Sequence, residues 1–337
     1  MASESKQLVL SASSISTFQT CKRRYFYEKV QNLRPVETAD SLAFGSAIHR
    51  GLERMFRGMM EAKHAREQYS ADFHRDTVDD AILSAYGEDL SESDRIKVEV
   101  LLVKYAERWL EEDMRERTVL GVEEHAKACI INPSTGKQMR NVFVQGYCDA
   151  IAMDGNKFSV IEHKTASIVN DDYFDHASID LQVYLYADIV SRCCGQDVRQ
   201  VIYDVIQKPR HEMVIGETDE EFEARRAAAK CPERCKRKEA ETPADFRARL
   251  NAAITEDYFR REYIRIDPDM LAEMRKELWE TSHEIKSCRS FTKSTCNCMK
   301  WGRCPFMDAC MHGGSFDGIE EKFTAREGRI NAYQSTN

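Results

Sequence analysis

Two carboxylates and a lysine, Asp149, Glu162 and Lys164, lie where the spacing of the chain brings them together. Aromatic and β-branched residues flank Gly155-Asn156 on both sides, which predicts two strands joined by a tight turn. If that turn has two residues, Asp149 pairs with Glu162 across the hairpin and Lys164 shares their face. Opposed carboxylates repel each other, which a structural pair would avoid and a divalent-cation site would exploit. The pattern predicts metal-assisted chemistry on water or a phosphate; the alternative is three solvent-facing charges.

Three more polar residues stand at helical spacing before and after this hairpin. Gln182 and Tyr186 are four residues apart, so they lie on one face of the helix that is expected to follow it. His49 lies beside the apolar stripe of an earlier predicted helix over residues 42–60, one turn after Gly45. The local pattern alone favours a buried core histidine over a metal ligand.

Five cysteines fall within residues 288–310 and form the strongest metal signal in the chain. The loops between Cys298, Cys304 and Cys310 are longer than the knuckles of most zinc sites, so zinc is the less favoured metal. Thiolates at such spacings fit an iron–sulfur cluster, which needs four of them, so one cysteine must come from elsewhere. Cys296 is a rival to Cys298 in this set.

The composition is that of an ordinary globular chain with an acidic balance. Its 337 residues can bury a full core, and 42% of them are hydrophobic. No apolar run approaches the ~18 residues of a membrane span, and the start lacks a signal sequence, so we expect an intracellular, cytoplasmic protein. In a reducing compartment the twelve cysteines stay as thiols. The net charge of −8 argues weakly against nucleic acid, although basic runs at 21–24 and 235–238 could line a groove.

Hydrophobic periodicity and turn residues suggest the order of the elements. Ser11 is expected to cap a helix of about four turns that contains Cys21. Further strands are expected at 119–131 and at 198–207, the second of them interior to the sheet. The expected plan is one domain over residues 1–315, with a helical lobe at 61–117, a charged insertion at 209–263 whose two helices share a Thr N-cap, and a cysteine-rich segment at 288–312, followed by a polar tail at 316–337.

Taken in order, these motifs resemble the PD-(D/E)XK nuclease superfamily, and specifically its RecB-like branch. That branch is recognised by a histidine in a helix, a GxxD strand, a (D/E)xK strand and a QxxxY helix. The corresponding residues here are Gly45 to His49, Gly146 to Asp149, Glu162 to Lys164, and Gln182 to Tyr186. The resemblance implies an α/β core, with a mixed central sheet flanked by helices and helical insertions.

The resemblance also implies a function, a metal-dependent deoxyribonuclease of the exonuclease type used in recombination, repair or phage DNA processing, encoded by a bacterium or phage. Mg²⁺ or Mn²⁺ would be held by Asp149, Glu162, His49 and the backbone carbonyl of His163. Lys164 would orient the attacking water. Gln182 and Tyr186, the remaining catalytic-site residues, would position DNA.

Relatives with an iron–sulfur cluster, such as AddB subunits, take one cysteine from ahead of the nuclease core and three from behind it. Cys21 fits the first place, and Cys298, Cys304 and Cys310 fit the others as ligands of a 4Fe–4S cluster. The first gap is longer here than in those families, so Cys296 remains a rival to Cys298.

Two other interpretations differ in class. One is a non-catalytic DNA-binding or scaffold protein that keeps the fold, which broken motifs would favour. The other is a subunit that works beside a helicase or recombinase; no GxxxxGK[ST] loop occurs, so any motor would be another chain.

Overall fold

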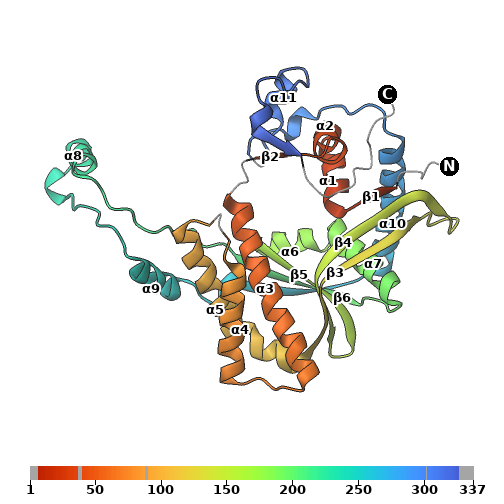
Figure 1. Ribbon diagram of the computed structural model, residues 1–337, viewed down its shortest axis with the longest axis horizontal. Coiled ribbons are helices and arrows are strands. Elements are labelled where there is room, and N and C mark those ends of the chain that lie inside the picture. Colours follow the sequence, from red (N-terminus) through yellow and green to blue (C-terminus); the bar gives the residue numbers. More distant parts are fainter. Residues whose placement is uncertain (1–6, 37–39, 88–89, 301, 326–337) are drawn as a thin grey trace.

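The computed structural model describes residues 7–36, 40–87, 90–300 and 302–325. A mixed six-stranded sheet lies at its centre with helices on both faces, so the predicted α/β class is confirmed (Figure 1). Within the described residues, no helix is long and apolar enough to cross a membrane.

The elements follow the chain as a short strand and helical segment, a helical lobe, the main strands, an insertion and a C-terminal helix with small elements after it. Their bounds are β1 Leu8–Leu10, α1 Ala12–Thr20, α2 Lys22–Tyr25, a π-helical turn Phe26–Val30, β2 Leu33–Pro35, α3 Asp40–Ala65, α4 Ala71–Ala85, α5 Glu92–Glu116, β3 Arg117–Ile131, β4 Gln138–Asp154, β5 Lys157–Ala166, α6 Asp171–Ala177, α7 Leu181–Cys194, β6 Gln200–Gln207, α8 Asp219–Ala228, α9 Pro243–Ala253, β7 Phe259–Arg265, α10 Pro268–Ser287, α11 Met307–Met311 and β8 Phe323–Ala325.

The long strand β4 organises the sheet. β3 runs antiparallel along one edge of β4. On the other edge, β1 pairs in parallel with residues 142–144 and β5 pairs antiparallel with residues 150–154. The described ladder leaves residues 145–149 of that edge between the two partners. We call this stretch of β4, residues 145–149 between β1 and β5, the fork. Asp149 lies at the end of the fork that adjoins the β5 ladder.

The predicted hairpin turn is confirmed. Asp154 pairs with Lys157 across Gly155-Asn156, and the same register continues to Ala150 opposite Ile161. Gly155 has a φ of +59°, which glycine adopts without the steric cost that other residues meet. The register fixed by this turn brings the Asp149 and Glu162 positions to the fork.

Two cores hold the sheet between its helices. Apolar residues of α3, α4 and α5 pack on one face against Ala150, Ile161 and Ile202. Helices α1, α7 and α10 pack on the other face against Val160 and Val201. β6 is almost wholly buried, as predicted for an interior strand, with β5 and β7 on its two sides.

The first helix is shorter than predicted. The Ser11 N-cap is present, and its side chain accepts a hydrogen bond from the Ser14 amide. Helix α1 nevertheless stops before Cys21, whose backbone is extended with a φ of −162°. The amide of Arg23 donates to the Thr292 carbonyl at 3.0 Å, so pairing with the C-terminal segment goes with the break at Cys21.

Two predicted boundaries also differ from the structure. The charged insertion ends before β7. The basic residues of β7 resemble those of the insertion, but Arg261 of β7 points inward to buried acids. Part of the predicted polar tail is folded: Phe316 and Phe323 pack around Phe306, and β8 pairs with β2. Residues 326–337 of that tail lie outside the described residues.

Candidate active site

The fork in β4 brings together residues from both faces of the sheet. Asp149 lies at the end of the β4–β5 ladder, and its Oδ2 accepts a hydrogen bond of 2.7 Å from the backbone amide of His163. Its Oδ1 lies 3.4 Å from Nδ1 of His49 on α3. The Asp149 carboxylate thus contacts both β5, through the His163 amide, and α3, through His49.

The alternation of β4 changes at Asp149. Cys148 and Ile151 pack in the same core, whereas Ala150 and Ala152 face the other one. A regular strand would place residues 148 and 151 on opposite faces. At this irregularity the Asp149 side chain points toward His49. The predicted regular cross-strand pair of Asp149 with Glu162 on one face is therefore not formed.

Glu162, Lys164 and Gln182 form a hydrogen-bonded triangle on the opposite face. Lys164 Nζ and Gln182 Nε2 both donate to Glu162 Oε1, the second over 2.7 Å, and Lys164 Nζ also donates to Gln182 Oε1 over 3.1 Å. Asp180 caps α7 by accepting from the Gln182 amide, which fixes the helix end that presents Gln182. Glu162 Oε2 is buried and has no hydrogen-bond partner among the described residues.

The pKa shifts follow from burial and close opposite charges. Burial raises the pKa of Glu162, and the negative charge of Asp149 adds to that effect, while Lys164 opposes it. Burial would raise the pKa of Asp149 too, but the hydrogen bond and charge of His49 and the positive charge of His163 lower it overall. Burial would lower the pKa of His49, and Asp149 reverses that effect. Of the two carboxyl groups, Asp149 is the one held ionised, and Glu162 is the one that a cation would stabilise.

Glycines allow the helices to approach these strands. A Cβ on Gly45 would lie 3.2 Å from Thr165 Oγ1, so α3 packs closely on β5 beside His49. A Cβ on Gly146 would lie 2.3 Å from Cε1 of Tyr186, so the ring of Tyr186 packs on the bare backbone of β4. The structure thus places Tyr186 against the GxxD strand, one turn along α7 from Gln182.

The donor set suits a hard divalent cation. Carboxylate and backbone oxygens are the ligands that Mg²⁺ prefers, and the buried Glu162 Oε2 has no hydrogen-bond partner among the described residues. In the described part of the chain, no three His, Cys, Asp or Glu side chains lie close enough together to hold one ion by themselves. A ligand set here would therefore have to combine side chains with a backbone carbonyl and water molecules.

Sequence reasoning missed two acids near this site. One is Glu123 of β3. Burial raises its pKa, and the charges of Asp149 and Glu53 raise it further, so Glu123 lies close to Asp149. Its φ of +54° is rare for a residue with a side chain, and no sequence pattern signals it. Asp204 of β6 is fully buried beneath His163, 3.6 Å from its Nδ1, within a run that predicts only an interior strand.

A buried ionic network holds His163 from below. Arg261 donates to Asp113 at 2.7 Å and to Asp204 at 2.7 Å, and Tyr105 donates to Asp204 at 2.6 Å. The His163 ring packs edge-on to Phe56, with 4.9 Å between ring centroids. The network fixes the part of β5 whose His163 amide donates to Asp149.

The cysteine-rich segment lies against the first helix. The Ser294 amide points to Cys21 Sγ at 3.4 Å, and Asn297 donates to the Thr20 carbonyl at 2.9 Å. Burial raises the pKa of Cys310, and the negative charges of Cys21 and Cys298 raise it further.

Cys304 lies near Cys298 and Cys310. Burial raises its pKa, and the charges of Cys298 and Cys310 add to the effect. Cys296 instead lies exposed beside the Ser294 hydroxyl, 3.2 Å away.

Comparison with known proteins identifies the class. The sequence profile of the PD-(D/E)XK nuclease superfamily matches residues 9–311, and the chain belongs to that superfamily. Members usually use Mg²⁺ or Mn²⁺. The family supports a nuclease activity and implies a DNA substrate. No curated protein sequence matches the chain.

Similar solved structures include one entitled "Crystal structure of SSO0001". It is 15% identical, and the match covers 62% of this chain and 74% of that chain with a TM-score of 0.28.

Proposed function

We propose that the protein is a Mg²⁺- or Mn²⁺-dependent DNA exonuclease of the RecB-like branch. The observation that carries the proposal is the buried Glu162 Oε2 without a partner, close to Asp149 and flanked by the Lys164 ammonium. Asp204 Oδ1 is also buried without a partner, but Asp204 faces the Arg261 cation, whereas Glu162 is under the influence of a second carboxylate, Asp149. The assignment of His49, Asp149, Glu162 and the His163 carbonyl as metal ligands is part of this proposal.

The residues of the fork divide the chemistry between them. A bound divalent cation would lower the pKa of its water and polarise the scissile phosphate. Asp149 is kept ionised by His49 and the His163 amide, so its charge is available without reorganisation. Lys164 lies where it can orient the attacking water and offset charge that develops on the phosphate. Gln182 holds Lys164 in place, and Tyr186 packs on β4, the strand that carries Asp149.

Cleavage assays with linear, circular and end-blocked DNA in Mn²⁺ test this proposal. We expect linear DNA to be degraded, and circular and end-blocked DNA to resist. Lys164→Ala should lower the rate by about 100-fold or more, in line with the loss of one group that stabilises a transition state. Lys157→Ala, at the other end of the same strand, is the control and should retain the wild-type rate. Unaltered turnover in Lys164→Ala with intact circular dichroism would reject the site, and cleavage of circular DNA would reject the exonuclease assignment.

We also propose that Cys21, Cys298, Cys304 and Cys310 bind a 4Fe–4S cluster. Each thiolate of such a cluster binds a different iron, so the four sulfurs stand farther apart than around one zinc ion. Cys21 and Cys298 raise the pKa of Cys310, and Cys298 and Cys310 raise the pKa of Cys304, which supports the set and favours Cys298 over Cys296.

Iron and sulfide analysis of protein purified without oxygen tests the cluster. Cys21→Ser should lose iron and solubility together, because the ligands come from both ends of the chain and cluster binding contributes to folding. Cys193→Ser, at an exposed site on α7, is the control and should do neither. One zinc per chain without iron would contradict the cluster and leave the nuclease proposal intact.

The remaining features of the proposal concern organisation. Residues 1–315 would form a single nuclease domain, and any helicase or recombinase that acts with it would be a separate chain.

A further inference from the structure

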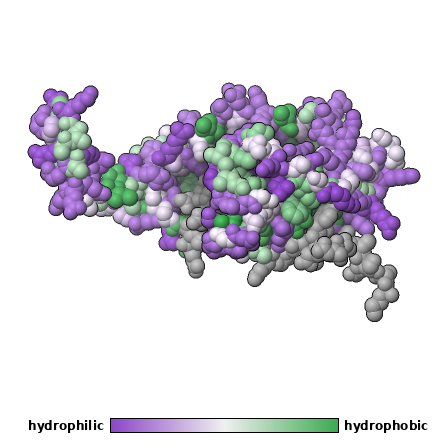
Figure 2. All heavy atoms as spheres, turned by 90° about the horizontal axis from the view of Figure 1, so that it is seen from above, coloured by the Kyte–Doolittle hydropathy of each residue, from purple (hydrophilic) through white to green (hydrophobic). Residues whose placement is uncertain are grey.

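The segment between β6 and α9, residues 209–242, projects from the body of the molecule as an arm (Figures 1 and 2). Its root lies beside the candidate active site, because the Lys208 amide donates to the Ala166 carbonyl at 2.8 Å, just beyond Lys164 on β5. The far side of the arm returns to the body through α9, where Phe246 and Leu250 are fully buried.

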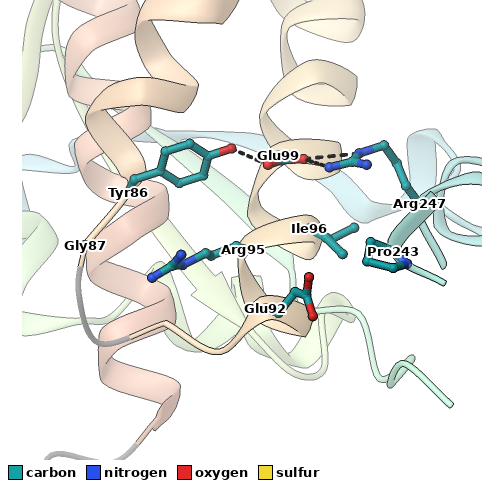
Figure 3. A pocket seen from close by; sticks show the side chains of 8 residues that line it. All are labelled: Tyr86, Gly87, Glu92, Arg95, Ile96, Glu99, Pro243 and Arg247. Atoms are coloured by element: carbon teal, nitrogen blue, oxygen red, sulfur yellow. Dashed lines mark hydrogen bonds and ion pairs between the residues drawn. The ribbon is translucent and has the colours of Figure 1, made fainter. Parts of the chain in front are cut away.

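The arm keeps its shape without a core of its own. Backbone bonds join its two sides: the Glu217 amide donates to the Lys238 carbonyl at 3.0 Å, and the Glu241 amide donates to Val214 at 2.9 Å. Helix α8 buries none of its residues. At the body, Arg247 of α9 pairs with Glu99 of α5, to which the Tyr86 hydroxyl also donates (Figure 3). The arm is thus anchored at its base and exposed along its length.

The tip of the arm, residues 225–238, is strongly basic in a chain of net charge −8. It carries seven Lys or Arg residues and one acid, Glu233. Three of these cations are neutralised inside the arm, because Arg225 pairs with Glu217, Arg226 with Glu223 and Arg237 with Asp219.

The other cations of the tip point to solvent. Lys230, Arg234 and Lys236 are exposed, and their side chains form no hydrogen bond or ion pair with any other residue that the structure describes. The ion pairs at the base of the tip therefore maintain its shape, and these three side chains are left available to a ligand.

We propose that the tip binds the sugar-phosphate backbone of DNA outside the active site, an inference that rests on the proposed function. A protein partner is less suited, because protein interfaces are anchored by Trp and Tyr together with Arg, and residues 225–238 contain no aromatic side chain. The same absence leaves nothing to stack on bases. Contact through Lys and Arg alone is independent of sequence and is expected of an element that holds a substrate during successive cleavages.

Salt-dependent binding tests the inference. The triple variant Lys230→Ala/Arg234→Ala/Lys236→Ala is compared with wild type by fluorescence anisotropy on labelled duplex DNA, without divalent metal so that nothing is cleaved. Each lost phosphate contact should reduce the slope of log Kd against log salt by about 0.9, so the triple variant should lose between about 1 and 3 units of slope. The matched control is Lys63→Ala/Lys137→Ala/Lys276→Ala, which removes the same charge at exposed sites on α3, the β3–β4 turn and α10.

The outcomes separate the arm from the nuclease proposal. A reduced slope in the arm variant alone supports the inference. An unchanged slope, or an equal loss in the control, overturns it, because the effect would then be absent or due to net charge. Cleavage of a short duplex by wild type is measured in parallel with Mn²⁺. Its failure would reject the proposed nuclease without altering the binding result.

Discussion

At Gly146 the GxxD motif is explained by packing. The Tyr186 ring occupies the space where a side chain on residue 146 would begin. The glycine therefore fixes the distance between β4 and α7, and with it the position of Gln182 relative to Asp149. Chemistry at the site depends on a residue that has no functional group.

Gly146→Ala should lower stability by about 1–3 kcal/mol, because the new methyl group meets the Tyr186 ring in a packed interior. Denaturant unfolding measures the change. In a Tyr186→Ala background the same substitution should cost much less, since the obstructing ring is gone. Equal losses in both backgrounds would place the strain elsewhere.

His49 is a second residue whose role can be separated from packing. Its side chain is 33% exposed and lies beside Asp149, unlike the neighbouring Ile48, which is fully buried. His49→Ala should raise the Mn²⁺ concentration for half-maximal activity while the melting temperature changes little. A core histidine would give the opposite result, with a lower melting temperature and an unchanged metal titration.

Strand β7 shows how an element is held by charge as well as by apolar contacts. Its Arg261 is 2% exposed and lies between the buried Asp113 and Asp204, whereas Arg260 beside it is partly exposed and pairs with Asp171 at the surface. A buried cation is tolerated only because both acids face it. The two arginines give the same sequence signal and have different energetic roles.

Arg261→Met should destabilise the protein by about 3–5 kcal/mol, because it leaves two buried carboxylates without a cation. Arg260→Met should change stability by about 1 kcal/mol or less, as for most exposed ion pairs. Urea unfolding of the two variants provides the comparison. Similar small losses in both would show that the buried network contributes little.

At the scale of the molecule, the chain is closed by contacts between its two ends. Helices α1 and α2 bind the C-terminal segment, because Thr20 accepts from Asn297 and Arg23 donates to Thr292, and β2 pairs with β8. The proposed cluster would lie at this junction, while the proposed catalytic ion would lie at the fork of the sheet. We therefore expect the two proposed metals to have separable effects on stability and activity.

Removal of divalent metal with EDTA should abolish cleavage and leave the melting temperature nearly unchanged, because the fork is held by hydrogen bonds without the ion. Oxidative loss of iron should lower the melting temperature, because the cluster joins the chain ends. Calorimetry and cleavage assays on the same samples measure both. A large fall in melting temperature with EDTA alone would contradict this division.

The sequence by itself determined the main helices and strands, the hairpin register and the order of the site residues. Each of these depends on local spacing: Gly155 sets the turn, and alternation and helical period set the faces. The same local rules failed at Cys21, where a contact with a segment far along the chain ends the helix, and at β7, where inward arginines hide a strand.

Only the tertiary structure decided which groups meet. The fork in β4 arises because β1 and β5 share one edge of the strand, and neither pairing is encoded near Asp149. Glu123 and Asp204 come close to the site through that arrangement, and their spacing in the sequence does not predict it. The sequence gives the identity of reactive groups, whereas their burial, pairing and charge depend on contacts between residues that are distant in the chain.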